Sequence, residues 1–402
     1  YDWYEKGRIH DGSSPAVAND HYARWREDAD LMAELGIETY RFGVEWSRIE
    51  PEQGRFEEAA LAHYREEAAY LVSCGIRPLL TLHHFTNPLW FERMGAFENP
   101  ESEAGFLRFA EKVVRAMGGL VSEYITINEP NVYAVNGYFF GAWPPGRRSF
   151  AATRAVMTRM AACHVRAYEM IHRVRREMGF SDTKVSFANH LRAFAPENPK
   201  NPWHRLAARL TETFFQGSLT RAMTRGERRF PVLRSEAICP GEYCDFIGVN
   251  YYTRSTVHGI GDGVRKGAPV NDLGWEIYPE GIAECAKKAY DLLPRPIYIT
   301  ENGTCDNADA FRARYILEHL KALAASGLPV ERYYHWCFCD NFEWLEGQSA
   351  RFGLIHIDYE TQARTVKESG HMFAELIRAG GVCDALCARY AKQAYPRNGE
   401  AN

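Results

Sequence analysis

The sequence predicts an α/β protein folded as a TIM-type (β/α)8 barrel. Short apolar, β-branched segments typical of buried parallel strands alternate with amphipathic helices along the chain. Two of these strands end in a glutamate, and such a barrel carries its functional groups at the carboxyl ends of its strands. No linker interrupts the alternation, so residues 1–402 are expected to form a single barrel domain. Hydrophobic residues make up 46% of the chain, enough for a large core.

The alternation begins after a polar, loop-like segment at residues 1–20. Helices are expected at residues 20–35, 59–74, 102–117, 151–178, 204–225, 279–291, 309–326 and 367–379. Strands are expected at residues 38–44, 76–84, 124–128, 184–189, 244–251, 296–300 and 330–336. Gly36 and Gly75 end the first two helices, a position where glycine is favoured. Seven strands are one fewer than a complete barrel has.

Two strand tips carry the candidate catalytic groups. The strand at 296–300 runs into Glu301, and an Asn-Gly turn follows. The strand at 124–128 runs into Glu129, where Pro130 stops it. One such glutamate alone would more often simply open a loop. Two at the tips of different barrel strands face each other across the mouth, which is the arrangement that glycoside hydrolysis requires.

The segments Thr126-Ile127-Asn128-Glu129-Pro130 and Ile299-Thr300-Glu301-Asn302-Gly303 resemble the acid/base and nucleophile signatures of family 1 retaining glycoside hydrolases, the β-glucosidase family. The resemblance covers essentially all of residues 1–380. It implies a retaining β-glycosidase that hydrolyses terminal β-D-glucosyl or related β-glycosyl residues by double displacement. It implies a small-molecule β-glycoside as substrate, and neither a metal nor a cofactor.

Other strand tips match positions of the family that support the nucleophile. Arg41 resembles the arginine that lies beneath it, although an arginine there is also common as part of a structural ion pair. Asn250-Tyr251-Tyr252 matches the motif whose second tyrosine donates a hydrogen bond to the nucleophile. Arg41, Asn250 and Tyr252 are therefore expected to hold Glu301 ionised and oriented.

A second group resembles the sugar-binding residues of the family. His84 corresponds to the histidine of the 3-hydroxyl, and Asn128 to the asparagine of the 2-hydroxyl. Trp336 is expected to stack under the sugar, while Glu343 and Trp344 bind its 4- and 6-hydroxyls. Each residue alone also fits a structural role, but six matching segments in the same order favour a site. Residues 345–349 lack the serine and lysine of phospho-glycosidases, which favours a neutral sugar.

Two features depart from the family. Phe85 follows His84, where the family usually has tryptophan. The family also carries an earlier strand followed by a sugar-binding glutamine, and the sequence has no counterpart to either. A gap is therefore expected between the strands at 40–44 and 333–336, the first and last of the seven. A catalytically impaired barrel that acts as a carbohydrate-binding or scaffold protein stays open as an alternative. An aldolase-like barrel would need a strand-tip lysine, and we find none.

Composition and simple sequence patterns narrow the expected partners and cellular location of the protein. A net charge of −4 gives no reason to expect nucleic acid or an acidic membrane as partner. The ten cysteines show neither disulfide-framework nor zinc-site spacing, so reduced thiols in a cytoplasmic protein are expected. No signal peptide or membrane-spanning apolar run is evident. The oligomeric state is not predicted.

Overall fold

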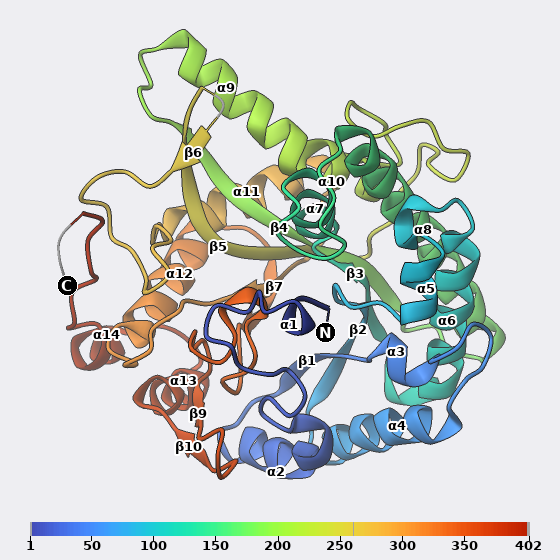
Figure 1. Cartoon of the computed structure of the whole chain (residues 1–402). Coiled ribbons are helices and arrows are strands. Elements are labelled where there is room, and N and C mark those ends of the chain that lie inside the picture. Colours follow the sequence, from blue (N-terminus) through green and yellow to red (C-terminus); the bar gives the residue numbers. More distant parts are fainter. Residues whose placement is uncertain (1, 260, 400–402) are drawn as a thin grey trace.

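The computed structural model describes residues 2–259 and 261–399, and confirms the barrel. Its parallel strands curve around a common centre, with helices outside them (Figure 1). They pair in the order β1-β2-β3-β4-β5-β7-β8, every neighbouring pair being parallel. Their bounds are β1 Thr39–Gly43, β2 Arg77–His83, β3 Glu123–Asn128, β4 Lys184–Pro196, β5 Ile247–His258, β7 Ile297–Asn302 and β8 Val330–His335.

The main helices follow the expected pattern. They are α2 His21–Glu34, α4 Glu58–Ser73, α6 Ser102–Met117, α8 Phe150–Glu177, α11 Glu280–Leu292, α12 Arg312–Ser326 and α13 Glu368–Ala379. The helix expected at 204–225 is divided into α9 Pro202–Glu212, the π-helical turn η4 Thr213–Gly217 and α10 Ser218–Arg225.

Short elements complete the fold. They are α1 Asp2–Glu5, α3 Trp46–Ile49, α5 Leu89–Arg93, η1 Ala96–Glu98, η2 Gly118–Leu120, α7 Pro130–Ala134, η3 Val135–Phe139, β6 Gly261–Gly263, η5 Trp344–Glu346, β9 Ile355–Ile357, β10 Arg364–Val366 and α14 Asp384–Tyr390. β6 pairs antiparallel with β5, and β9 pairs with β10 outside the barrel.

Burial explains why these segments form these elements. In α6, Phe106, Phe109 and Val113 lie on one face and are fully buried against the barrel. Lys112 and Arg115 lie on the outer face and form ion pairs. Strands β3 and β7 are buried along their whole length because helices cover the outside of the sheet and side chains fill its inside.

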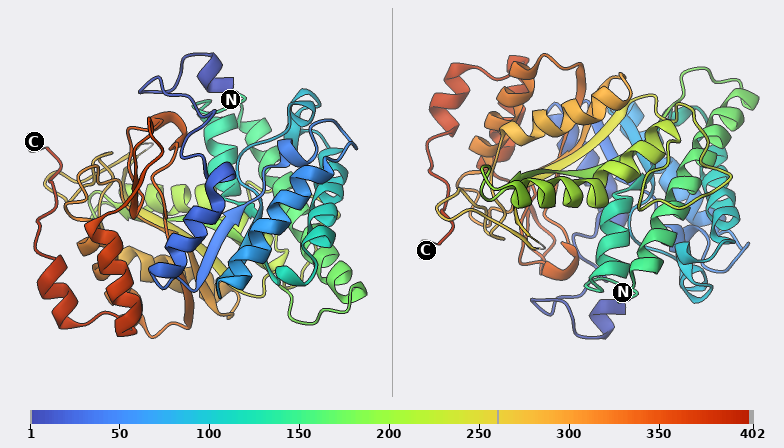
Figure 2. Two further views of the ribbon diagram at one scale, coloured as in Figure 1. Left: turned by 90° about the horizontal axis from the view of Figure 1, so that it is seen from below. Right: turned by 90° about the horizontal axis from the view of Figure 1, so that it is seen from above.

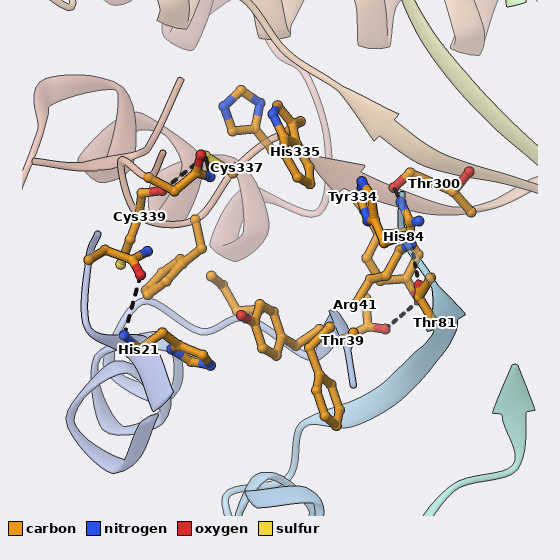
Figure 3. A pocket seen from close by; sticks show the side chains of 18 of the residues that line it. His21, Thr39, Arg41, Thr81, His84, Thr300, Tyr334, His335, Cys337 and Cys339 are labelled. Carbon is orange, nitrogen blue, oxygen red and sulfur yellow. Dashed lines mark hydrogen bonds between the residues drawn. The ribbon is translucent and has the colours of Figure 1, made fainter. Parts of the chain in front are cut away.

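The barrel is open at one seam, between β1 and β8, as expected. In the described part of the chain these two strands form no backbone ladder with each other. A side-chain contact bridges them instead: the hydroxyls of Thr39 and Tyr334 are 2.7 Å apart. Arg41 of β1 also reaches past the seam to β7, where it donates to the carbonyl of Thr300 over 3.1 Å. A cavity of about 420 Å³ lies along the seam, and Figure 3 looks into it.

The structure also differs from the expectations in places. β4 and β5 continue beyond the barrel and pair with each other over residues 193–196 and 254–257. Cys337 and Cys339 lie buried in the loop after β8. All ten cysteines are free thiols. Among the described residues, no helix is both long and apolar enough to cross a membrane.

The first residues lie over the catalytic end of the barrel. In Figure 2, α1 and the loop that follows β8 project from the same end. The amide of His10 donates to the carbonyl of Leu345 over 2.7 Å, and the carboxylate of Asp11 accepts from the amides of Gln348 and Ser349. The N-terminal segment thus supports the loop that carries several of the predicted sugar-binding residues.

Candidate active site

Glu301 is the penultimate residue of β7 and is only 4% exposed. Arg41 Nη1 donates to its Oε1 over 2.6 Å, and the hydroxyl of Tyr252 donates to its Oε2 over 2.6 Å. Burial raises the pKa of Glu301 to about 7, with a further raising contribution from Glu129, whereas the Arg41 charge and these two hydrogen bonds lower it. Both oxygens therefore face a donor, and the donors favour the ionised form.

Glu129 follows β3 in a different setting. Its backbone adopts the left-handed conformation, with φ of 42°, before Pro130 opens α7. A residue other than glycine rarely adopts this conformation, and such strain is concentrated at functional sites. Its Oε1 accepts hydrogen bonds from Asn250 Nδ2 over 2.9 Å and from His190 Nδ1 at 3.0 Å. No donor among the described residues contacts Oε2, so that oxygen is free to carry a proton.

His190 is a site residue that the sequence analysis missed. It lies on β4, and its ring stacks on that of Tyr252 with the centroids 5.7 Å apart. Arg192, also on β4, donates from Nε to His190 Nε2 over 3.1 Å. Because a guanidinium cannot accept a hydrogen bond, Nε2 must be the acceptor, and the proton of the ring lies on Nδ1. His190 is therefore neutral and donates to Glu129.

The neutral imidazole decides where the pair of carboxyls holds its proton. A positively charged His190 would lower the pKa of Glu129, but the bond from Arg192 excludes that form. Without that charge, burial and the facing carboxylate of Glu301 raise the pKa of Glu129, and the hydrogen bonds from His190 and Asn250 lower it. Because Arg41 forms an ion pair with Glu301 and not with Glu129, this arrangement favours the proton on Glu129 and the negative charge on Glu301.

Asn128 connects the two halves of the site. Its Oδ1 accepts from Arg41 Nη2 over 2.6 Å and from Asn250 Nδ2 over 3.0 Å. Its Nδ2 lies 3.0 Å from Nε2 of His84. Asn250 Oδ1 accepts in turn from the hydroxyl of Thr300 over 2.6 Å. This network fixes the side chains beneath both carboxyl groups, because each polar atom in it has a defined partner.

A cavity of about 240 Å³ opens above the two carboxyls. Its lining includes His84, Phe85, Glu129, Asn136, Trp143, His190, Arg192, Phe215, Tyr252, Trp275, Glu301, Trp336, Glu343, Trp344 and Phe352. The flat faces of several aromatic rings and a few convergent polar groups suit a sugar ring with its hydroxyls.

The loop after β8 forms one wall of this cavity. Trp336 Nε1 donates to Glu343 Oε2 over 3.2 Å, so the expected stacking platform and the expected hydroxyl ligand are held together. Burial raises the pKa of Glu343 to about 8, and the charge of Glu301 acts in the same direction. Trp344 has its ring centroid 5.0 Å from Phe85 and 5.7 Å from Trp143. Phe85 thus packs where a larger ring would otherwise stand.

Comparison with known proteins decides the family. The sequence matches the family model described as Glycosyl hydrolase family 1 over residues 1–382. The chain belongs to this family.

Similar family 1 proteins come from several prokaryotes. Beta-glucosidase A of Thermotoga maritima is 32% identical, over 94% of this chain and 91% of that protein. A beta-galactosidase of Saccharolobus solfataricus is 30% identical, over 96% of this chain and 91% of that protein. The solved structure of a beta-glycosidase from Pyrococcus horikoshii superposes with a TM-score of 0.87 at 35% identity, covering 98% of this chain and 93% of that one.

The structure brings all ten predicted site residues of this family 1 protein together. Seven line the cavity: His84, Glu129, Tyr252, Glu301, Trp336, Glu343 and Trp344. Arg41, Asn128 and Asn250 lie beneath them in the hydrogen-bond network. Asn250 contacts Glu129, not Glu301 as expected, because its side chain points across the barrel toward β3. No cluster of potential metal ligands occurs among residues 2–259 and 261–399.

His190 and Arg192 could have been found from one signal in the sequence. Polar residues follow the apolar run of the strand at 184–189, as glutamates follow the strands of the two carboxyls. A third polar strand tip predicts a further contribution to the mouth of the barrel.

Proposed function

We propose that this family 1 protein is a retaining β-glycosidase that hydrolyses terminal β-D-glucosyl or related β-glycosyl residues. The proposal rests mainly on one observation: two buried carboxyls share one cavity but have different hydrogen-bonding partners. Arg41 and Tyr252 hold Glu301 as a charged nucleophile, whereas neutral His190 leaves Glu129 as the proton carrier. This is the division of roles that double displacement needs.

The first step transfers the glycosyl group to the protein. Glu301 attacks the anomeric carbon as the bond to the leaving oxygen breaks, and Glu129 donates its proton to that oxygen. A glycosyl ester forms and the charge of Glu301 disappears. With that charge gone, the pKa of Glu129 falls, and the carboxylate can accept a proton from water in the second step. The two carboxyls should lie about 5–5.5 Å apart for this mechanism.

The remaining predicted residues would hold the sugar. His84, which lines the cavity, and Asn128, which lies beneath it, would contact the 3- and 2-hydroxyls, with Trp336 as the platform and Glu343 and Trp344 as ligands of the 4- and 6-hydroxyls. The absence of a cationic pocket in residues 345–349 supports a neutral sugar. The names of the relatives include both glucosidases and galactosidases. These two sugars differ in configuration at the 4-position, so the proposal includes β-glycosides of either configuration there.

A second candidate is a carbohydrate-binding barrel with impaired catalysis. The seam cavity favours it, because Arg41, His84 and Trp336 also line that cavity and are therefore less firmly supported than the β3 and β5 side of the site. Under this alternative the protein binds sugars but turns them over very slowly.

Proton NMR during hydrolysis of 4-nitrophenyl β-D-glucoside and β-D-galactoside tests the proposal. We expect the β-anomer of the sugar to appear first, followed by slow mutarotation. The α-anomer appearing first would show inversion and contradict the mechanism. Binding of the sugar without turnover would instead support the second candidate.

A further inference from the structure

The outer surface of α9 carries an unpartnered apolar stripe. Trp203, Leu206 and Leu210 recur at helical spacing and lie on one side of the helix. Trp203 is 73% exposed and Leu210 is 60% exposed. Helices that cover a barrel normally turn such a side inward, but α9 lies at the rim of the molecule, outside the ring of barrel helices (Figure 1).

Phe214 connects this stripe to a second apolar group. It continues the row of α9 into η4, and its ring centroid lies 5.4 Å from Phe139 and 5.8 Å from Phe150. Phe150 in turn lies 5.9 Å from Phe230, which is 63% exposed. Together with Phe140, which contacts Phe139, these side chains form one continuous surface. The apolar face consists of Phe139, Phe140, Phe150, Trp203, Leu206, Leu210, Phe214 and Phe230.

Basic side chains are interspersed with the apolar face. Those that are exposed and have no carboxylate within 4 Å among the described residues are Arg148, Lys200, Arg205, Arg209, Arg228, Arg229 and Arg234. Of the nearby acids, Glu212 and Glu227 are paired with Lys288 and Arg221, and Glu197 lies 3.7 Å from His204, so that Glu236 is left as an exposed acid beside the seven cations. The face is therefore locally cationic, although the chain as a whole has a net charge of −4.

We propose that the apolar face docks on an anionic lipid surface. Exposed tryptophan, leucine and phenylalanine beside arginine and lysine are the combination that binds the boundary between headgroups and acyl chains. Apolar side chains gain free energy by leaving water, and each basic side chain gains attraction to anionic headgroups. This inference does not depend on which β-glycoside the protein hydrolyses.

Two other occupants fit less well. A second copy would meet this face with the same cations across a two-fold axis, and like charges would repel each other. A different protein partner would have to present carboxylates opposite these cations, and the vesicle experiment below separates that outcome from lipid binding.

The apolar face borders the catalytic cavity, so docking on lipid would also position the mouth of that cavity. Phe215, next to Phe214, lines the catalytic cavity, and so do Asn136 and Trp143, which flank Phe139 and Phe140 in sequence. The rim of the cavity is therefore continuous with the apolar face. A docked molecule would hold its cavity mouth close to the lipid surface.

Sedimentation with lipid vesicles tests the proposal on the full chain. We expect binding to vesicles of phosphatidylcholine mixed with phosphatidylglycerol to be at least about tenfold tighter than to phosphatidylcholine alone, and to weaken at high salt. No binding to either vesicle, or equal binding to both, would overturn the proposal.

Two variants separate the charge from the apolar contribution. Arg205→Gln/Arg209→Gln/Arg228→Gln/Arg229→Gln should weaken binding by about 100-fold or more, because each basic residue contributes roughly a factor of five near an anionic surface. Trp203→Glu/Leu210→Glu should weaken it by about tenfold or more, since both side chains lose their burial in lipid. Unchanged binding in both variants would overturn the proposal even if the wild-type protein binds vesicles.

Matched controls lie outside the face. Arg77→Gln/Lys321→Gln removes exposed cations on β2 and α12, and Leu89→Glu changes an exposed leucine on α5. Both should bind as the wild type does, and melting temperatures should show that every variant is folded. If altering the face changed the oligomeric state and the wild-type protein did not bind vesicles, the apolar face would be a self-association surface, and the proposal would be overturned. Binding of single-stranded RNA in place of vesicles would likewise overturn the proposal.

Discussion

At the scale of single residues, two identical side chains receive different tasks from their neighbours. Glu301 has a guanidinium and a phenol against its two oxygens. Glu129 has a neutral imidazole and an amide on one oxygen only. A charged neighbour stabilises the carboxylate far more than a neutral donor does, so the shared proton belongs on Glu129.

Substitution of Glu129 should affect substrates unequally. In Glu129→Ala, an aryl glycoside with a good leaving group needs no proton and should lose little in the first step, whereas poor leaving groups should slow by about 100-fold or more. Added azide should restore turnover by replacing the water that Glu129 activates, and should give a glycosyl azide. Steady-state rates across a series of aryl glycosides check this. Equal loss for every leaving group, with no effect of azide, would indicate a structural role.

Removal of the hydroxyl of Tyr252 should shift the acid limb of the pH profile. Its hydrogen bond lowers the pKa of Glu301, so Tyr252→Phe should raise that pKa by about one unit. Glu301 must be ionised to attack, and the acid limb of kcat/KM should therefore move to higher pH by the same amount. A profile that drops uniformly, with both limbs unmoved, would contradict this role.

At the scale of elements, the sequence predicted the order of helices and strands but not all of their extents. α6 begins and ends as expected because its buried face repeats without interruption. The expected helix at 204–225 is interrupted by η4. A π-helical turn keeps an apolar periodicity close to that of an α-helix, so the sequence pattern did not reveal this interruption. The ends of β4 and β5 were missed because the two segments pair with each other beyond the barrel, a contact that no local pattern shows.

The residues of the candidate site were likewise predicted only in part. Its ten predicted residues stand at strand tips or in one loop, where a family pattern fixes them. His190 and Arg192 follow the apolar run of β4, and they were missed because the expected strand was ended at residue 189. The partner of Asn250 could not be predicted either. Its position after a strand shows which end of the barrel it occupies, but the direction of its side chain depends on the whole barrel.

The open seam should be the least protected part of the barrel. β1 and β8 each lack a neighbour on one side, and backbone groups there exchange with solvent unless something covers them. We expect the amides of Phe42 and Tyr334 to exchange at least about tenfold faster than that of Ile127, which lies in a strand paired on both sides. Hydrogen exchange followed by mass spectrometry or NMR measures this. Equal protection at the three positions would contradict it.

At the scale of the whole molecule, one buried cluster ties the start of the chain to its end. His21 of α2 lies 2.7 Å from Asp28 and 3.1 Å from Glu67, and Arg364 near the C-terminus donates to Asp28 over 2.9 Å. The cluster lies beside the seam cavity, where the barrel lacks backbone pairing. We infer that these ion pairs, rather than a ladder, hold the two sides of the seam together.

The cluster predicts how stability depends on pH. Burial opposes the charge of His21, but hydrogen bonds to Asp28 and Glu67 outweigh it and raise the pKa of His21 from 6.5 to about 10. A raised pKa of a base means that its stabilisation is complete below pH 6.5 and is lost as the pH rises toward 10. Wild-type melting temperature should therefore fall over this range.

The variant His21→Asn isolates that contribution. It should be less stable than the wild type by roughly 2–4 kcal/mol near pH 6, because two buried carboxylates lose a cation. The difference between the two proteins should shrink as the pH rises to about 10. Thermal unfolding at several pH values checks this, and a constant difference would contradict the assignment.

Local and global charge also differ across the molecule. A net charge of −4 gave no reason to expect an acidic membrane as partner, but a sum over the chain does not record where the charges lie. Arginines gather beside the apolar face around α9, while many acids elsewhere are paired. Only the folded structure shows this separation, because the segments that form the face are distant in sequence.

Covalent trapping tests the central claim, that Glu301 is the nucleophile of a double displacement. With 2-deoxy-2-fluoro-β-D-glucosyl fluoride the second step should be slowed more than the first, so the glycosyl ester accumulates. We expect one added fluorosugar per chain, located on Glu301 by peptide mass spectrometry, and no labelling and no turnover in Glu301→Gln. Turnover without any covalent adduct, or an adduct on another residue, would contradict it.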